Sequence, residues 1–186
     1  MAPRVPRSFG AFIGKRGFHM NRWSDRPPEV QRLLNPSFCS MLLWYSARGH
    51  AEASRGREGI AFEECFLVLP MVLHRETRES LPPRTRTSLP VWLGRNPLAP
   101  STIADRARSL IPFTKEALLF AGAYEVIHFD QTTIRANPVW RSRMDLALED
   151  SSEEVRSCAK SAEFVGKWFG KTGNSETILS LLGVRP

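Results

Sequence analysis

The chain has 186 residues and a formal net charge of +7, from 26 Lys+Arg against 19 Asp+Glu. A hydrophobic share of 42%, with five Trp and eleven Phe, is enough to bury a core, which excludes wholesale disorder and the collagen-like, low-complexity and coiled-coil classes. The longest apolar stretch, Phe66 to Leu73, contains Pro70 and is far shorter than the roughly 20 residues of a membrane span. Three scattered cysteines without C-x-x-C spacing argue against a disulfide framework or a zinc cluster and favour a reducing, cytoplasmic location.

Residues 1–20 form a basic segment rich in Pro and Gly, ahead of a single domain over residues 21–186. The segment has no helical or alternating period, so we expect a disordered tail. Met20 directly precedes the organised sequence and is an alternative start of translation, which would make the tail an upstream extension. The functional alternative is a basic arm that follows phosphates without sequence preference. Its cations precede any acid of the chain: Arg4, Arg7, Lys15 and Arg16.

Prolines and apolar periodicity predict three helices in the first half of the chain. Two prolines precede a short helix over about 27–34, and Asn35-Pro36 ends it and begins a second helix that Gly49 should end. Residues 49–59 are expected to form a loop or a frayed extension of the second helix. Phe62 to Leu73 is apolar almost all round, and Pro70 argues against a central strand, so we predict a buried helix with its first turn, or a kink, at Pro70.

Residues 88–137 have the element order of a winged helix-turn-helix. The pattern predicts helices over about 88–96, 101–111 and 112–121, followed by a hairpin of residues 124–130 and 132–136. Pro112 is expected to begin the third helix, because proline is tolerated in a first turn.

The last third of the chain is predicted to be helical over about 151–183. Ser151-x-x-Glu154 is a capping box, and an apolar stripe then runs to Gly170 or Gly173. Asn174 is expected to cap a short final helix. The predicted fold is therefore mainly α with a small β-hairpin, a compact helical domain that contains a winged helix-turn-helix-like unit.

No motif for catalysis, metal binding or cofactor binding is recognisable. The four histidines are isolated from one another and from any Cys or Asp cluster, so no metal-ligand spacing can be written. The string Gly166-Lys-Trp-Phe-Gly-Lys lacks the spacing of a phosphate loop and falls inside a predicted helix. A metal-dependent nuclease would need clustered carboxylates, which the sequence does not offer. We therefore expect no enzymatic activity and no cofactor.

Nucleic-acid contact, if present, is expected to reach phosphates and not base edges. The third helix would be the reader of a winged helix, yet its polar side chains are only Thr114, Lys115 and Glu116, whereas base readout uses Arg, Asn, Gln or Lys aimed into the major groove. A helix this apolar is more typical of a surface that another protein covers. The candidate backbone-phosphate contacts are Arg106, Arg108, Lys115 and Arg135.

The densest polar cluster follows the predicted buried helix and is the candidate site for a protein partner. Its members are His74, Arg75, Glu76, Arg78 and Glu79. A rigid neighbouring helix would hold these charges in place for precise pairing. The cluster opens a longer basic stretch that includes Arg84, Arg86 and Arg95. Arginine favours bidentate contact with carboxylate or phosphate, although a merely solvated surface is the alternative.

Three strings in a fixed order carry a family resemblance: RPPEVQRLLNPSFC over 26–39, FLVLPMVLHRETRESLP over 66–82 and ILSLLGVRP over 178–186. With them, the chain from about residue 21 to its end resembles the middle component of bacterial three-component ABC-ATPase systems. The resemblance implies a noncatalytic adaptor between an ABC-type ATPase of the chromosome-maintenance and repair kind and a system-specific effector, in loci proposed for conflict with phage or plasmids. It implies no catalytic residues. The alternative is a winged-helix DNA-binding protein, acting as a regulator or as the DNA-contact subunit of a complex.

Overall fold

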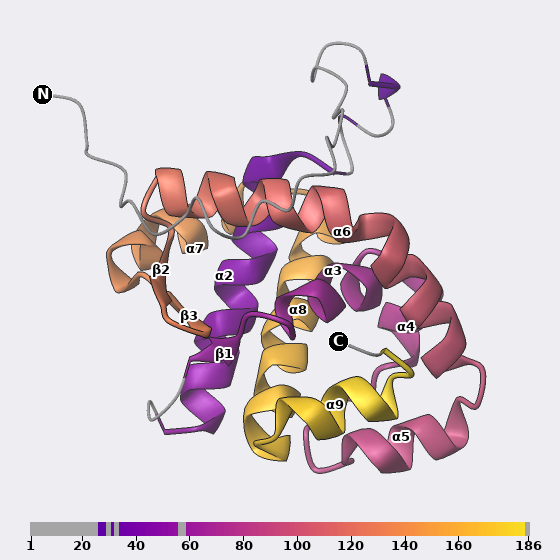
Figure 1. Cartoon of the computed structure of the whole chain (residues 1–186). Helices are drawn as coiled ribbons and strands as arrows, with labels where there is room; N and C mark the ends of the chain where they lie inside the picture. Colours follow the sequence, from indigo (N-terminus) through magenta and orange to yellow (C-terminus); the bar gives the residue numbers. More distant parts are fainter. Residues whose placement is uncertain (1–25, 29–30, 32–33, 56–58, 185–186) are drawn as a thin grey trace, which may run out of the picture.

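The computed structural model describes residues 26–28, 31, 34–55 and 59–184. Within these residues it contains eight α-helices and a three-stranded antiparallel sheet, which confirms the prediction of a mainly helical fold with a small β element (Figure 1). The predicted tail over 1–20 and half of the predicted helix over 27–34 lie outside the described residues. None of the described helices combines the length and hydropathy that a membrane span requires.

The described part of the chain forms helices and strands in the following order. They are α2 (Pro36–Ala53), β1 (Ile60–Ala61), α3 (Cys65–Val72), α4 (Arg75–Ser80), α5 (Leu89–Arg95), α6 (Ala99–Ala123), β2 (Ile127–Asp130), β3 (Thr133–Ala136), the 3-10 helix η3 (Pro138–Trp140), α7 (Arg141–Glu149), α8 (Glu153–Thr172) and α9 (Ser175–Leu181).

Helices α2 and α8 pack directly against each other through glycine. The prediction that α2 ends at Gly49 is wrong, because Gly49 lies inside the α2–α8 contact and the helix continues for another turn. A Cβ atom at Gly49 would lie 2.2 Å from the carbonyl oxygen of Glu163, and one at Gly166 would lie 1.9 Å from that of Ser46. Only glycine allows two backbones to approach so closely. Tertiary packing therefore overrides the tendency of glycine to end a helix.

The predicted buried helix at residues 62–73 is confirmed as α3. It packs against α2, α6 and α8, and every residue from Leu67 to Val72 is buried. Pro70 lies inside the helix and not at its first turn, so the carbonyl of Phe66 loses the hydrogen bond that a residue with an N–H would donate. The helix ends two residues after this break.

The predicted boundary between two helices at Pro112 is wrong, because α6 is one continuous helix of 25 residues. Its buried residues form one stripe along both halves: Ile103, Ala104, Ala107, Thr114, Ala117, Leu118 and Ala121. This stripe packs on α2 and α3. Pro112 removes only the hydrogen bond to the carbonyl of Arg108, a residue on the solvent side, where water can replace it. The turn that a helix-turn-helix requires is therefore absent between residues 99 and 123, and the winged-helix unit is not confirmed.

The predicted hairpin is confirmed and gains a third strand. β2 pairs with β3 in the register Ile127↔Ala136 to Asp130↔Thr133, and β1 pairs with the other edge of β3 through Ile60↔Ile134. Two residues are too few to show alternation, so the sequence did not predict β1, which lies between the predicted 49–59 segment and the predicted helix over 62–73.

The C-terminal helices agree with the prediction, apart from one cap. Ser152, and not Ser151, caps α8 by accepting from Val155 N, and Glu154 is not part of a capping box. Gly173 ends α8 with a φ of 72°, in the left-handed region that favours glycine. Asn174 caps α9 as predicted.

A chain of ion pairs crosses from α7 over α2 to α8. Arg48 Nη2 lies 2.5 Å from Glu163 Oε2 and its Nη1 lies 3.4 Å from Asp145 Oδ1. Lys167 Nζ reaches Glu163 at 2.8 Å and Glu52 at 3.0 Å. Burial opposes ionisation of Glu163, but hydrogen bonds and positive charge from Lys167 and Arg48 outweigh it, so the pKa of this carboxyl lies below its ordinary value of 4.5.

The depressed pKa of Glu163 predicts an acid-sensitive contribution to stability. Because the folded state favours the ionised carboxylate, the contribution is present above pH 4.5 and is lost as the pH falls through the lower folded-state pKa. We expect the wild-type free energy of unfolding to fall more steeply than that of Glu163→Gln between about pH 5 and about pH 3. Urea titrations across this range measure the two slopes, and identical slopes would contradict the assignment.

Candidate functional site

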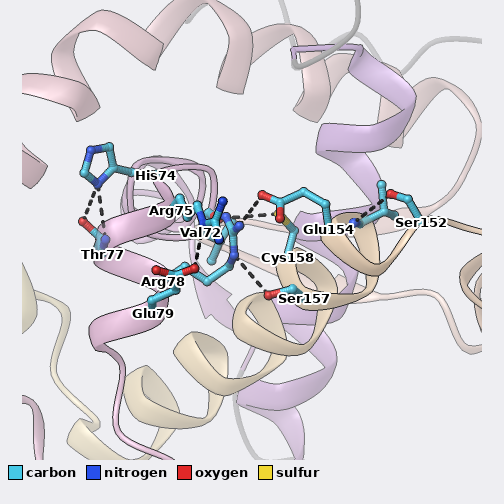
Figure 2. A network of polar contacts seen from close by, with 11 residues as sticks. Val72, His74, Arg75, Thr77, Arg78, Glu79, Ser152, Glu154, Ser157 and Cys158 are labelled. Atoms are coloured by element: carbon cyan, nitrogen blue, oxygen red, sulfur yellow. Dashed lines mark hydrogen bonds and ion pairs between the residues drawn. The ribbon is translucent and has the colours of Figure 1, made fainter.

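The predicted partner-contact residues lie on and just before α4, a short helix between α3 and the linker to α5 (Figure 2). His74 caps this helix, since its Nδ1 accepts from Thr77 N at 3.3 Å and lies 3.0 Å from Thr77 Oγ1. The imidazole is therefore used to begin the helix, which orients the charged residues that follow it.

Arg78 is directed into the protein and not toward solvent. It is 6% exposed and its Nη1 donates to Val72 O at 2.7 Å. The same guanidinium donates to Ser157 Oγ at 3.2 Å and to the carboxylate of Glu154 (Figure 2). Arg78 thus joins the end of α3 to the first turns of α8. Its charge is satisfied within the fold, so it is not available as a surface contact.

Three of the predicted residues remain on the surface of α4, and we call Arg75, Glu76 and Glu79 the α4 surface. Arg75 Nε donates to Glu79 Oε1 at 2.7 Å, and their side chains are 75% and 60% exposed. A pair this exposed contributes little to stability, because water competes for both charges. The pair is accordingly free to exchange its internal contact for one with a partner.

Arg106, a predicted phosphate contact, uses its guanidinium for hydrogen bonds within the protein. Its Nε donates to Pro70 O at 3.2 Å and its Nη2 to Thr77 Oγ1 at 2.8 Å, so it ties α6 to α3 and α4. Burial lowers the pKa of its guanidinium.

The other three predicted phosphate contacts differ in exposure. Arg108 is exposed and its Nη1 lies 2.5 Å from Asp105 Oδ1, while Lys115 is exposed further along α6. Seven residues separate them, which places them on the same side of the helix about 10 Å apart. Arg135 is half-buried on β3, opposite His128. The structure therefore separates Arg106 from Arg108 and Lys115 and does not assemble the four into one surface.

Large apolar side chains are exposed where α6 ends and the hairpin begins. Leu119 is 59%, Tyr124 60% and Val139 78% exposed. The rings of Phe120 and Tyr124 lie 4.5 Å apart, and the Phe129 ring packs over the backbone of α6. Gly122, which the Phe129 ring contacts, is two residues from both Phe120 and Tyr124, so Phe129 lies on a different side of α6 from these two rings. We call the five residues around this end of α6, Leu119, Phe120, Tyr124, Phe129 and Val139, the hairpin-end surface.

Asn137 ties η3, which carries Val139, to the backbone of residues 125 and 126, just after the end of α6. Its Nδ2 donates to Glu125 O at 2.7 Å and its backbone N to Val126 O at 3.1 Å. The apolar character of residues 112–121 pointed to protein contact here, but the sequence did not show which apolar residues face solvent. That choice depends on which side of α6 packs on α2 and α3.

The cysteine thiols and the carboxylate of Glu64 lie in the interior of the fold. All three cysteines are buried free thiols, and burial raises the pKa of each. A polar pocket of about 210 Å³ lies beside β1, where the buried carboxylate of Glu64 accepts from Ser175 Oγ at 2.8 Å. Among the described residues, no group of three or more His, Cys, Asp or Glu side chains could hold a metal ion.

Comparison with protein families matches residues 23–186 to ABC-three component (ABC-3C) system Middle Component 3. No curated protein and no solved structure matches the chain. The matched range includes every described residue and both surfaces defined above. The chain therefore belongs to the Middle Component 3 family of ABC-three component systems.

Proposed function

We propose that this chain is a noncatalytic adaptor that links an ABC-type ATPase to a system-specific effector in a bacterial anti-phage or anti-plasmid defence complex. Membership of a middle-component family supports action within a multi-component assembly. The observation that carries the proposal is the presence of two different exposed surfaces at opposite ends of one helix.

The α4 surface and the hairpin-end surface are separated by most of the length of α6 (Figure 1). Arg106, near the start of α6, contacts Thr77 of α4, whereas Gly122, near its end, contacts the Phe129 ring. Sixteen residues of helix correspond to about 24 Å. Two partners could therefore bind at once without sharing a contact residue.

The two surfaces differ in chemistry, so each fits a different kind of partner. The hairpin-end surface offers aromatic and aliphatic side chains, which supply most of the binding energy at protein interfaces. The α4 surface offers an exposed Arg75–Glu79 pair with Glu76, which is suited to charge recognition and selectivity. We propose that each surface binds a different subunit.

The test is co-expression of the full chain with the products of its two flanking genes, followed by affinity purification and native mass spectrometry. Leu119→Glu with Tyr124→Glu should release one subunit and retain the other, since loss of a central apolar contact costs at least about 2 kcal/mol, roughly thirty-fold in affinity. Arg75→Glu should weaken binding of the second subunit.

Leu98→Glu is the matched control for the apolar surface, because Leu98 is 75% exposed at the opposite end of α6. This variant should retain both subunits. Failure of the wild-type chain to bind either flanking product would contradict the adaptor proposal, and loss of both subunits with the control variant would contradict the assignment of the surfaces.

A further inference from the structure

The linker between α4 and α5 is held rigidly by two buried tryptophans. Trp92 Nε1 donates to Ser80 O at 2.8 Å, before the linker, and Trp168 Nε1 donates to Thr87 O at 2.8 Å, near its end. The two indole rings pack together with centroids 5.5 Å apart. Between these two anchors the backbone makes a turn, closed by Thr87 N to Arg84 O at 3.3 Å. The linker is therefore a fixed feature of the surface.

This turn displays a cluster of cations that the fold does not neutralise. Arg84 and Arg86 are exposed, and Lys171, also exposed, reaches the turn from the end of α8 through a 2.6 Å contact of its Nζ with Thr85 Oγ1. The sequence has no acid between Glu79 and Asp105. Among the described residues, none of the three cations forms an ion pair, in contrast to Arg48, Arg75, Arg78, Arg108 and Lys167.

We propose that Arg84, Arg86 and Lys171 form a surface that binds the phosphate backbone of double-stranded nucleic acid. Arginine presents a planar fork of donors that fits a phosphate, and lysine adds a point charge. This assignment does not depend on the adaptor proposal, and it differs from the contacts expected on α6 from the sequence.

The chemistry of this surface favours a polyanion over an acidic protein. The exposed side chains of residues 83–88 are Pro83, Arg84, Arg86 and Ser88, without the large apolar groups that fill the centre of a protein interface. Phosphate contacts need no such centre, because release of counterions drives the binding. A net charge of +7 on the whole chain favours the same partner.

The test is fluorescence anisotropy of the full chain with a labelled duplex of about 30 base pairs, from about 50 to about 200 mM KCl. The variant carries Arg84→Gln, Arg86→Gln and Lys171→Gln. We expect its affinity at low salt to fall at least about tenfold and the slope of log affinity against log salt to decrease by about 2.7, the value for three lost phosphate contacts. The basic segment at residues 1–20 is the same in all proteins compared.

A matched control carries the same charge change on α6 and α8: Arg108→Gln, Lys115→Gln and Lys160→Gln. It should retain most of the affinity and of the salt slope. An equal loss in both variants would show that only net charge matters, and a loss in the control alone would place the contact on α6; either result overturns the proposal. So does absence of wild-type binding, or equal binding of a labelled polyglutamate peptide.

A second variant tests whether the loss of affinity for the duplex comes from altered folding. Arg84→Gln with Arg86→Gln leaves the Lys171–Thr85 contact intact, and thermal melts of both variants should match the wild type because all three side chains are exposed. The double variant is expected to lose about two-thirds of the slope that the triple variant loses. An unchanged slope in a folded double variant would overturn the assignment.

Discussion

Replacing Gly166 by alanine is expected to destabilise the protein by about 3 kcal/mol or more, which corresponds to a fall in Tm of roughly 10 °C. The new Cβ would lie 1.9 Å from Ser46 O and 2.7 Å from Ser46 C, both backbone atoms of α2. Backbone in a central helix cannot move aside as a flexible side chain can. The α2–α8 contact must therefore open, and buried apolar surface on both helices would be lost.

Gly94→Ala is the matched control, because it makes the same change inside another helix. A Cβ at Gly94 would meet nothing within 4 Å. Alanine is favoured over glycine in a helix by about 1 kcal/mol, so this variant should be slightly more stable than the wild type. Thermal melts followed by circular dichroism measure both. Equal Tm values for the two variants would show that α2 and α8 are not in the close contact described.

Replacing Arg78 by alanine is expected to cost about 3 kcal/mol, because it leaves the buried carbonyl of Val72 without its charged donor. Arg78 Nη1 lies 2.7 Å from this carbonyl, and the nearby Cys158 Sγ, at 3.6 Å, is a weak substitute. The partner carboxylate of Glu154 is 62% exposed and can return to water, so the loss is set mainly by the buried hydrogen bonds.

Arg75→Ala provides the comparison on the same short helix. Arg75 is exposed and pairs only with Glu79 in the described part, so its removal should leave the Tm nearly unchanged. Chemical denaturation of both variants measures the difference. A small effect of Arg78→Ala would contradict its role in joining α3 to α8, and a large effect of Arg75→Ala would show that the exposed pair contributes to folding.

The two arginines show how far the predicted partner site could be inferred. Charge density after a buried helix identified α4, and three of the five residues there are on its surface. Arg75 and Arg78 are one helical turn apart, and the sequence does not show that the first is exposed and the second is buried. The difference arises because Glu154 and Ser157 of α8, more than 70 residues away in the chain, accept hydrogen bonds from Arg78.

The predicted helix boundaries at Gly49 and Pro112 are wrong because long-range packing, and not local propensity, determines where these helices end. Gly49 and Pro112 are helix breakers by local propensity, and local propensity was the only information available for them. Each lies inside a helix because the stripe of buried residues continues past it and gains more from packing than the break costs. The winged-helix prediction rested on the break at Pro112 and lost its support when the two helix halves proved to be continuous.

The sequence by itself determined the mainly helical class, the hairpin, the buried helix around Pro70, the cap at Asn174 and the family resemblance, because each follows from local propensity, short-range periodicity or contiguous strings of residues. The tertiary structure alone decided which charges are buried and which are exposed. It also brought Lys171 beside Arg84 and Arg86, and it determined which apolar residues are exposed around the end of α6. These arrangements depend on contacts between residues far apart in the chain, and single-sequence periodicity contains no information on which helix faces meet.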